Sequence, residues 1–360
     1  LLLPLSDPGA KRAEARALRS SAQYTQESLR LVTEASVAST YFNLLSAQER
    51  VRIAEQNLKN FKDIQGIIQA RFDNGLDSGL ELAQQKETVA NSEATLATLR
   101  QTSKIYHNAL ALLLGHAPQT FEIESSSNIN TLVVPEIEPA QPSVLLERRP
   151  DIHAIEAQLI AANANIGAAR AAFYPSISLG VTGSLSSTGL SDPITTALGL
   201  ASSLTAPIFQ GGALTGGLHA ADASQRELVE LYRKTVLTAF KEVEDSLAAV
   251  TAASERQKAL KEAVNQSQKA YDISRKRYDV GSIDFQTLLT TQTNLLSAED
   301  SYAQALNYKL TASADLVKSL GGGWKDNTQP LPVAALETDG PLTPELPAEP
   351  VAAPEKGQKL

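Results

Sequence analysis

The chain has 360 residues, a formal net charge of −8, and neither cysteine nor methionine. The lack of cysteine excludes disulfide bonds, thiolate metal sites and cysteine catalysis. The acidic balance and the absence of a basic run argue against a nucleic-acid-binding face, and no apolar stretch is long enough to predict a membrane-spanning helix.

Residues 1–9 are apolar and then interrupted by proline and glycine, and we interpret them as the ragged end of a truncated sequence. A long helix is predicted from about residue 10 to residue 72, because apolar residues recur there every seven positions. After a turn at Gly75, a returning helix is predicted over 80–114 with a second such series. The first series is Val37, Leu44, Val51, Leu58 and Phe72, with a polar break at Gln65, and the second is Leu82, Val89, Leu96 and Leu110.

Residues 118–147 are rich in serine, asparagine and proline, which predicts a linker, and its short apolar run at 132–134 is a candidate strand or packing segment. A helix is predicted over 151–173, where apolar residues alternate at spacings of three and four. It begins after Arg148-Arg149-Pro150-Asp151 and ends at Tyr174-Pro175, because proline suits a first helical turn and stops a helix elsewhere.

The period then changes from that of a helix to that of a strand. Residues 176–185 and about 196–208 alternate between apolar and small polar side chains, around a glycine- and proline-containing loop at 186–195. This pattern fits either a half-buried hairpin on a soluble core or two strands that cross a bilayer in a barrel closed by other subunits. No other clear strand accompanies them and an isolated hairpin is marginal in water, which favours the bilayer. The predicted lipid-facing residues are Ile177, Leu179, Val181, Leu198, Leu200 and Leu204.

A second long helical hairpin is predicted from about residue 213 to Gly321, with its turn at Gly281. It repeats the first, because Gly75 and Gly281 lie 206 residues apart and the same offset pairs other identical residues. These pairs include Glu49 with Glu255, Arg71 with Arg277, Asp73 with Asp279, and Leu110 with Leu316. Sustained seven-residue spacing predicts coiled-coil hairpins with a left-handed supercoil, and the run from about residue 10 to residue 72 would span about 90 Å at about 1.5 Å per residue.

These observations divide the chain into six parts. They are a truncated first repeat (1–117), a linker (118–147), a helix (148–174), a β-hairpin (175–210), the second repeat (211–323) and a disordered tail (324–360). The fold class is therefore mainly α, built from duplicated antiparallel coiled-coil hairpins plus one amphipathic β-hairpin.

The segments Arg148–Ile152 and Ala161–Leu179 closely resemble one family: the TolC-like outer-membrane channels of tripartite efflux pumps, in their NodT/OprM-type lipoprotein branch. The resemblance covers residues 10–322. It implies a homotrimer in the Gram-negative outer membrane, in which four strands per protomer form a shared lipid-embedded β-barrel and the helices form a periplasmic α-barrel. It also implies a passive conduit for drugs or other small molecules in multidrug resistance, served by a periplasmic adaptor protein and an inner-membrane RND-type transporter.

In the family the adaptor contacts the tips of the helical hairpins. The matching residues here are Arg71, Phe72, Gly75, Arg277, Tyr278 and Gly281. Many members carry an aspartate after the paired leucines past the second turn, but here Leu288-Leu289 is followed by Thr290, so an aspartate ring is not carried over. The tunnel-entrance candidates are Asp279, Asp284 and Thr290. The alternative is that the two glycines serve only as turn residues and the two acids are merely solvated.

The chain also departs from the family at its start. The counterparts of residues 151–210 fall before residue 5, so three such chains would supply six strands, too few for an open lumen. We therefore expect an N-terminally incomplete sequence that lacks its signal peptide and lipid-bearing cysteine. The loop at 186–196 is short and gives no information on extracellular specificity.

The sequence contains no motif that predicts a metal site or a phosphate-binding site. The four histidines have no metal-ligand spacing, and the glycines at 321–323 follow a helix, whereas phosphate-binding glycines precede one. We therefore expect no enzyme activity, cofactor or metal. Two alternatives to the efflux channel stay open, namely a soluble coiled-coil scaffold and a nonfunctional fragment of such a channel.

Overall fold

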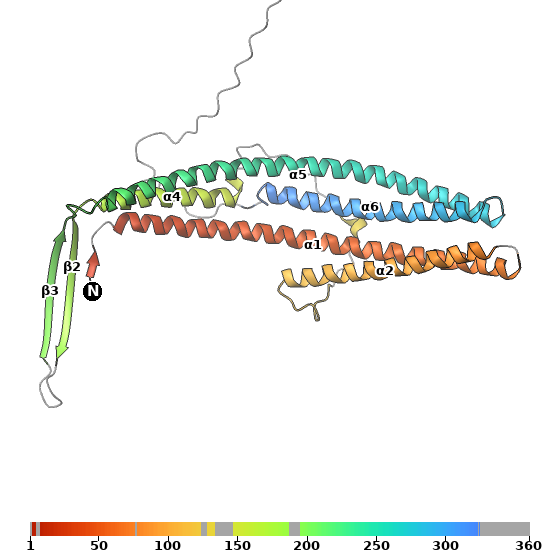
Figure 1. Ribbon diagram of the computed structural model, residues 1–360, viewed down its shortest axis with the longest axis horizontal. Coiled ribbons are helices and arrows are strands. Elements are labelled where there is room, and N and C mark those ends of the chain that lie inside the picture. The colour runs from red at the N-terminus through yellow and green to blue at the C-terminus, as the bar shows by residue number, and fades with distance from the viewer. Residues whose placement is uncertain are drawn as a thin grey trace, which may run out of the picture. The chain divides into compact units, whose positions relative to one another are not determined.

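The computed structural model describes residues 2–4, 8–75, 78–123, 128–133, 147–186, 195–322 and 324. Its elements are β1 (Leu2–Pro4), α1 (Pro8–Asp73), α2 (Gly79–Leu113), the 3₁₀ helix η1 (Ile129–Thr131), α4 (Pro150–Ala171), β2 (Ser176–Ser186), β3 (Thr195–Thr205), α5 (Ala213–Asp279) and α6 (Phe285–Ser319), drawn in Figure 1. Most of the predicted linker, the strand loop at 187–194 and the predicted tail from 325 lie outside the described residues.

The chain forms two compact units, which we describe separately. One comprises the described residues up to 17 and those between 160 and 223, and contains the strands. The other comprises residues 18–159 and 224–328, and contains the helical hairpins. None of the helices in the described part of the chain combines the length and the hydrophobicity that a membrane-spanning helix needs.

The strands of this unit form a three-stranded antiparallel sheet in the order β1-β2-β3. β2 and β3 pair along their whole length, with Ile177 opposite Leu204 and Val181 opposite Leu200. Within residues 1–9, which we interpreted as a ragged end, Leu2–Pro4 pairs with β2, and α1 begins at Pro8, slightly before its predicted start. The sequence does not predict β1, because three residues are too few to show an alternating pattern. β1 pairs with the edge of β2 that β3 leaves open.

The predicted helical hairpins are confirmed: α2 returns along α1, and α6 along α5 (Figure 1). Leu82, Val89, Leu96 and Leu110 are all buried, as the second seven-residue series of the first repeat predicts. Between the two helices of this hairpin, Gln85 Nε2 donates to the Phe61 carbonyl at 2.7 Å. Coiled-coil packing of this kind buries one stripe of each helix and leaves the rest exposed.

The series predicted for α1 coincides only in part with the most buried positions: Leu44 is 1% exposed, but a neighbouring row is buried more continuously. That row lies three residues further on, at Ala47, Ala54, Phe61 and Ile68, whose side chains are at most 5% exposed. Val51 and Leu58 lie at its edge, partly buried against Ala54 and Leu96, and Phe72 is 41% exposed. Both rows have the same spacing, so periodicity alone does not decide which one faces the partner helix.

Within the helical unit the two hairpins also pack against each other. Near the turns, Ile68 of α1, Leu82 of α2, Tyr271 of α5 and Leu288 of α6 share one buried cluster. Farther along, Asn57 Nδ2 donates to Glu299 Oε2 at 3.0 Å, which joins α1 to α6. Hydrophobic contacts and buried polar contacts therefore fix the register between the repeats.

Glu49 on α1 fastens η1 to the helices. Its carboxylate accepts from Asn130 Nδ2 at 3.1 Å and from Arg52 Nη2 at 2.8 Å, and the side chain is 7% exposed. The hydrogen bond from Arg52 lowers the pKa of Glu49, helped by the Arg52 charge and the two asparagines of the η1 segment and opposed by burial. Ile129 of η1 packs beside it against Leu45 and Leu310.

Glu49→Gln is therefore expected to destabilise the folded protein at pH 7 by about 1–2 kcal/mol, because the replacement loses charge-assisted hydrogen bonds. Because the pKa of Glu49 is lower in the folded state than in the unfolded state, its ionised form stabilises the fold. This stabilisation is present at pH values above the unfolded-state pKa, about 4.3, and is lost as the pH falls through the folded-state pKa. The gap between wild type and variant should close on acidification in thermal unfolding followed by circular dichroism. Glu55→Gln is the matched control, since Glu55 is half exposed and pairs with Arg100, and a gap that persists at low pH would contradict the assignment.

Candidate functional site

The tip of the second hairpin is a glycine-capped helix end. Gly281 has φ +73°, its N–H donates to the Tyr278 carbonyl at 2.9 Å, and the Ser282 N–H donates to the Arg277 carbonyl at 2.9 Å. This pair of bonds is a Schellman motif, which satisfies the last carbonyls of α5 and reverses the chain. Asp284 then caps α6.

The tip of the first hairpin has the same plan with different caps. Gly75 has φ +70°, and its N–H donates to the Phe72 carbonyl at 2.9 Å. Ser78 caps α2 in a reciprocal arrangement with Glu81, in which each side chain bonds the other residue's backbone N–H. Residues 76 and 77 lie outside the described residues.

The two tips touch each other through Arg71 and Tyr278. The Arg71 guanidinium carbon lies 5.5 Å from the centre of the Tyr278 ring, a cation–π distance. Tyr278 is 6% exposed and lies 6.4 Å from the buried Phe285 ring, centre to centre. Of the six predicted docking residues, Phe72, Gly75, Arg277 and Gly281 are exposed, Arg71 is half-buried and Tyr278 belongs to the core of this chain.

Sequence reasoning missed a set of apolar side chains that are exposed at or near the tips. They are Ile67, Leu80, Ile273 and Val280, with exposed fractions from 40% to 78%. Ile67 and Ile273 occupy equivalent positions in the two repeats. Their signal was an isoleucine at the same repeat position in both halves, outside the seven-residue series.

The tunnel-entrance candidates are all exposed. Asp284 Oδ1 accepts from the Thr287 N–H at 2.8 Å, and the hydrogen bonds from Thr287 lower the pKa of Asp284, so it stays ionised near neutral pH. Thr290 Oγ1 donates to the Gln286 carbonyl at 2.8 Å. Asp279 is the last residue of α5. Asp284 thus has a capping role whatever else it does.

Gly281→Ala should destabilise the second tip by about 1–2 kcal/mol, because a residue with a Cβ is strained at φ +73°. The strain is purely conformational, since nothing lies within 4 Å of the added carbon. Gly66→Ala is the matched control: it is equally uncrowded but helical, and should stabilise by about 1 kcal/mol. Thermal unfolding measures both, and equal effects of the two substitutions would contradict the argument.

The strand register places all six predicted lipid-facing residues on one face of the sheet. Their exposed fractions range from 46% for Leu179 and Val181 to 83% for Leu198. The opposite face carries small and polar side chains: Ser178 and Ser203 hydroxyls lie 2.6 Å apart, and a Cβ on Gly199 would come within 2.8 Å of Thr182 Oγ1. The hairpin is therefore amphipathic, and none of the residues that the structure describes covers its apolar face.

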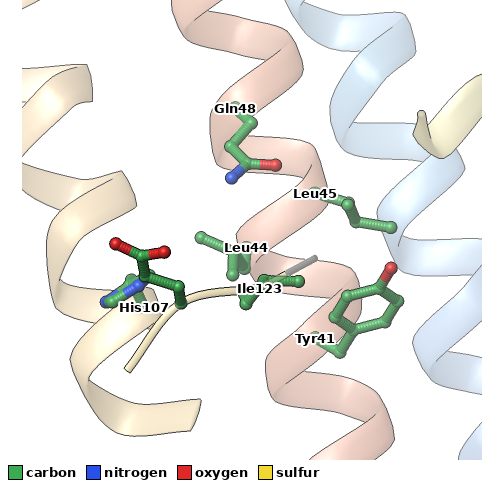
Figure 2. A pocket seen from close by; sticks show the side chains of 7 residues that line it. Tyr41, Leu44, Leu45, Gln48, His107 and Ile123 are labelled. Carbon is green, nitrogen blue, oxygen red and sulfur yellow. The ribbon is translucent and has the colours of Figure 1, made fainter. Parts of the chain in front are cut away.

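A cavity of about 340 Å³ lies between α1, α2 and residues 122–123 (Figure 2). Leu44, Leu45 and Ile123 supply apolar walls, while Gln48 and His107 supply polar ones, and Tyr41 closes one side. The His107 Nδ1 atom is buried without a hydrogen-bond partner. Across the described residues, no three His, Asp or Glu side chains are grouped as a metal site would need.

Comparison with known proteins agrees with the architecture. The profile of the family described as "Outer membrane efflux protein" matches residues 3–116 and 141–322. The pyoverdine export outer membrane protein OpmQ of Pseudomonas putida is 38% identical over 320 residues, which cover 88% of this chain and 68% of that protein. The outer membrane protein OprJ of Pseudomonas aeruginosa is 34% identical over 303 residues, which cover 82% of this chain and 63% of OprJ.

The fold is likewise that of solved channels. The open state of the Neisseria gonorrhoeae MtrE outer membrane channel aligns with a TM-score of 0.78 at 28% identity, over 89% of this chain and 73% of MtrE. The chain spans about two thirds of the length of the curated relatives it matches. Both helical hairpins and the strands β2 and β3 lie inside the matched ranges, and the chain belongs to the family of outer membrane efflux proteins.

Proposed function

We propose that this efflux channel receives a periplasmic adaptor protein at its hairpin tips and a cargo from an inner-membrane RND-type transporter. The chain itself is the exit duct of a tripartite efflux pump, a passive conduit for small molecules from the periplasm to the exterior. The observation that carries this is the family match across both hairpins and the strands, together with an apolar strand face that the described residues leave exposed.

The exposed tip surface supports the docking proposal. It combines the predicted residues Phe72 and Arg277 with the apolar side chains of Leu80, Ile273 and Val280. Apolar side chains grouped with an arginine are typical of the centre of a protein–protein interface. The buried Tyr278 acts beneath this surface, as the ring on which Arg71 rests.

The strand face supports a homotrimer in contact with outer-membrane lipid. Two eleven-residue strands are long enough to cross a bilayer when tilted, and strands can stay there only in a closed barrel. One chain cannot close a barrel with the strands described, so the sheet is completed by other copies. The apolar face then meets lipid and the small polar face meets the lumen.

The cargo is chosen elsewhere in the pump. Relatives of this chain are named for pyoverdine export, for toluene efflux and for antibiotic efflux, three chemically unlike cargoes. A wide, water-filled duct serves all of them without a selective pocket, and the transporter then supplies both selection and energy. Catalysis is no part of this role.

Two measurements test the proposal. The natural, full-length product should fractionate with the outer membrane and run as a trimer in detergent without boiling, whereas a soluble species would favour a coiled-coil scaffold. Val280→Asp and Ile273→Asp should then abolish site-specific cross-linking to the adaptor and restore drug sensitivity while trimers persist. Ile105→Asp is the matched control, since Ile105 is equally exposed on α2 away from the tips. If all three behave alike, the tips are not the docking surface.

A further inference from the structure

The chain makes a tight reversal directly after α6. Gly321 and Gly322 have φ +89° and +61°, and the Trp324 N–H donates to the Gly321 carbonyl at 2.9 Å. A Cβ on Gly321 would lie 2.2 Å from the Arg148 carbonyl oxygen, and one on Gly322 would lie 2.1 Å from Leu31 Cδ1. Only glycine fits at both positions, so the reversal is pressed between α1 and the residues that precede α4.

The reversal brings Trp324 into a cluster of three aromatic rings. The Trp324 ring lies 5.5 Å from that of His153 on α4 and 6.0 Å from that of Tyr24 on α1, and His153 and Tyr24 lie 5.4 Å apart, measured between ring centres. Each ring touches the other two, so three segments distant in sequence meet at His153. We call Tyr24, His153 and Trp324 the ring cluster.

Both nitrogens of His153 face oxygen atoms that accept hydrogen bonds. Nδ1 lies 3.0 Å from Glu156 Oε2, and Nε2 lies 3.3 Å from the Glu147 carbonyl oxygen. A neutral imidazole has one N–H and satisfies only one of these acceptors, whereas the imidazolium has two. The faces of tryptophan and tyrosine also attract a cation more than a neutral ring.

The groups around His153 favour the same protonation state. From α5, the Tyr232 hydroxyl donates to the other Glu156 oxygen at 3.4 Å, and burial followed by the Glu156 charge raises the pKa of Tyr232, so it stays a neutral donor. The nearby Arg149 is already paired with Asp151 and Glu242. The Glu156 carboxylate therefore faces the imidazole directly, and it stabilises a positive ring.

We propose that the ring cluster is a protonation-dependent clasp, closed when His153 carries two protons and opened when it loses one. In the closed state, the clasp holds the Trp324 ring against Tyr24 of α1 and His153 of α4. As the pH rises, one ring nitrogen loses its N–H and turns a lone pair toward an acceptor, which weakens the contact with Trp324. The strength of the contact between Trp324, which follows the second repeat, and His153 of α4 therefore depends on the pH of the surrounding medium.

Trp324 makes this directly measurable, because it is the only tryptophan in the chain. The intact chain in detergent is titrated from pH 5 to pH 9 while tryptophan emission and its quenching by acrylamide are recorded. Wild type should show a single-proton step, spread over about two pH units, toward red-shifted and more quenchable emission at high pH. Circular dichroism should stay constant, which separates the step from unfolding.

Three variants decide the cause. His153→Phe keeps a ring between Tyr24 and Trp324 without titratable nitrogens, and should remove the step. Glu156→Gln replaces the carboxylate with an amide that stabilises the imidazolium less, and should move the step to lower pH. His116→Gln is the matched control, because that histidine stacks on Phe121 and should leave the step unchanged. A flat wild-type titration, or a step that survives in His153→Phe, would overturn the proposal.

Discussion

Arg149→Ala is expected to destabilise the helical unit by about 3 kcal/mol, because the guanidinium joins three elements from a buried position. Its Nη2 and Nε atoms bond both Asp151 oxygens at 2.7 and 3.0 Å, and its Nη1 lies 2.7 Å from Glu242 Oε2 on α5. The same Nη1 donates to the Ser319 carbonyl at the end of α6, at 3.3 Å. Alanine would leave these oxygens without their partner where water has little access.

Electrostatics shows why the site tolerates a buried charge. Burial alone would lower the pKa of Arg149, but the hydrogen bonds and charges of Asp151 and Glu242 outweigh it and raise the pKa. The Glu242 side chain is 46% exposed, so this pair contributes less than the Asp151 fork. Arg149→Lys keeps the charge and loses the planar fork, and should fall between wild type and alanine.

Unfolding in guanidinium chloride, followed by circular dichroism in detergent, measures these differences. Arg233→Ala is the matched control, since Arg233 forms an exposed pair with Glu230 on the surface of α5 and its loss should cost less than about 1 kcal/mol. The role assigned to Arg149 fails if its alanine variant unfolds at the same denaturant concentration as that of Arg233.

Sequence spacing predicted the hairpins because a coiled coil repeats its interhelical contact about every two turns, and each contact requires an apolar residue at that position. The turns were predicted from Gly75 and Gly281, and the structure confirms that both glycines have the positive φ that a chain reversal requires. Strand alternation predicted which side chains share the apolar face, and the pairing of Val181 with Leu200 confirms it. Local periodicity is thus sufficient where one element meets one neighbour.

Contacts between distant segments were not predictable in this way. Tyr278 continues a seven-residue apolar series of α5 and was also predicted as a docking residue at the tip. It is buried, and the cluster around it draws on four helices, whose mutual position no local pattern encodes. His153 and Trp324 meet only because Gly321 and Gly322 turn the chain back after α6. The motif Arg148-Arg149-Pro150-Asp151 was recognised as a helix start, but the reach of Arg149 to Ser319 required the structure.

Leu200→Arg is expected to abolish assembly in the outer membrane. A lipid-facing arginine near the bilayer midplane destabilises the membrane-inserted barrel by about 2–4 kcal/mol per protomer. Leu200 is the central residue of β3, pairs with Val181 at the centre of β2, and is 75% exposed. If the apolar face contacts lipid as proposed, an arginine there would place a charge among lipid tails, where neither water nor a protein partner can compensate it. Fractionation and the mass of the unboiled complex measure the loss of trimers.

Ala201→Arg is the matched control, because Ala201 adjoins Leu200 on the same strand but points to the opposite, small and polar face. A charge on that face meets a water-filled lumen, so trimers should form and only conduction should change. Leu200→Met keeps the face apolar and should assemble normally. If Leu200→Arg assembles as well as Ala201→Arg, the apolar face does not contact lipid. If both arginine variants assemble poorly while Leu200→Met assembles, the strand responds to side-chain size and not to which face carries the charge. Only the contrast between the two arginines, at neighbouring positions of one strand, identifies lipid as what covers this face.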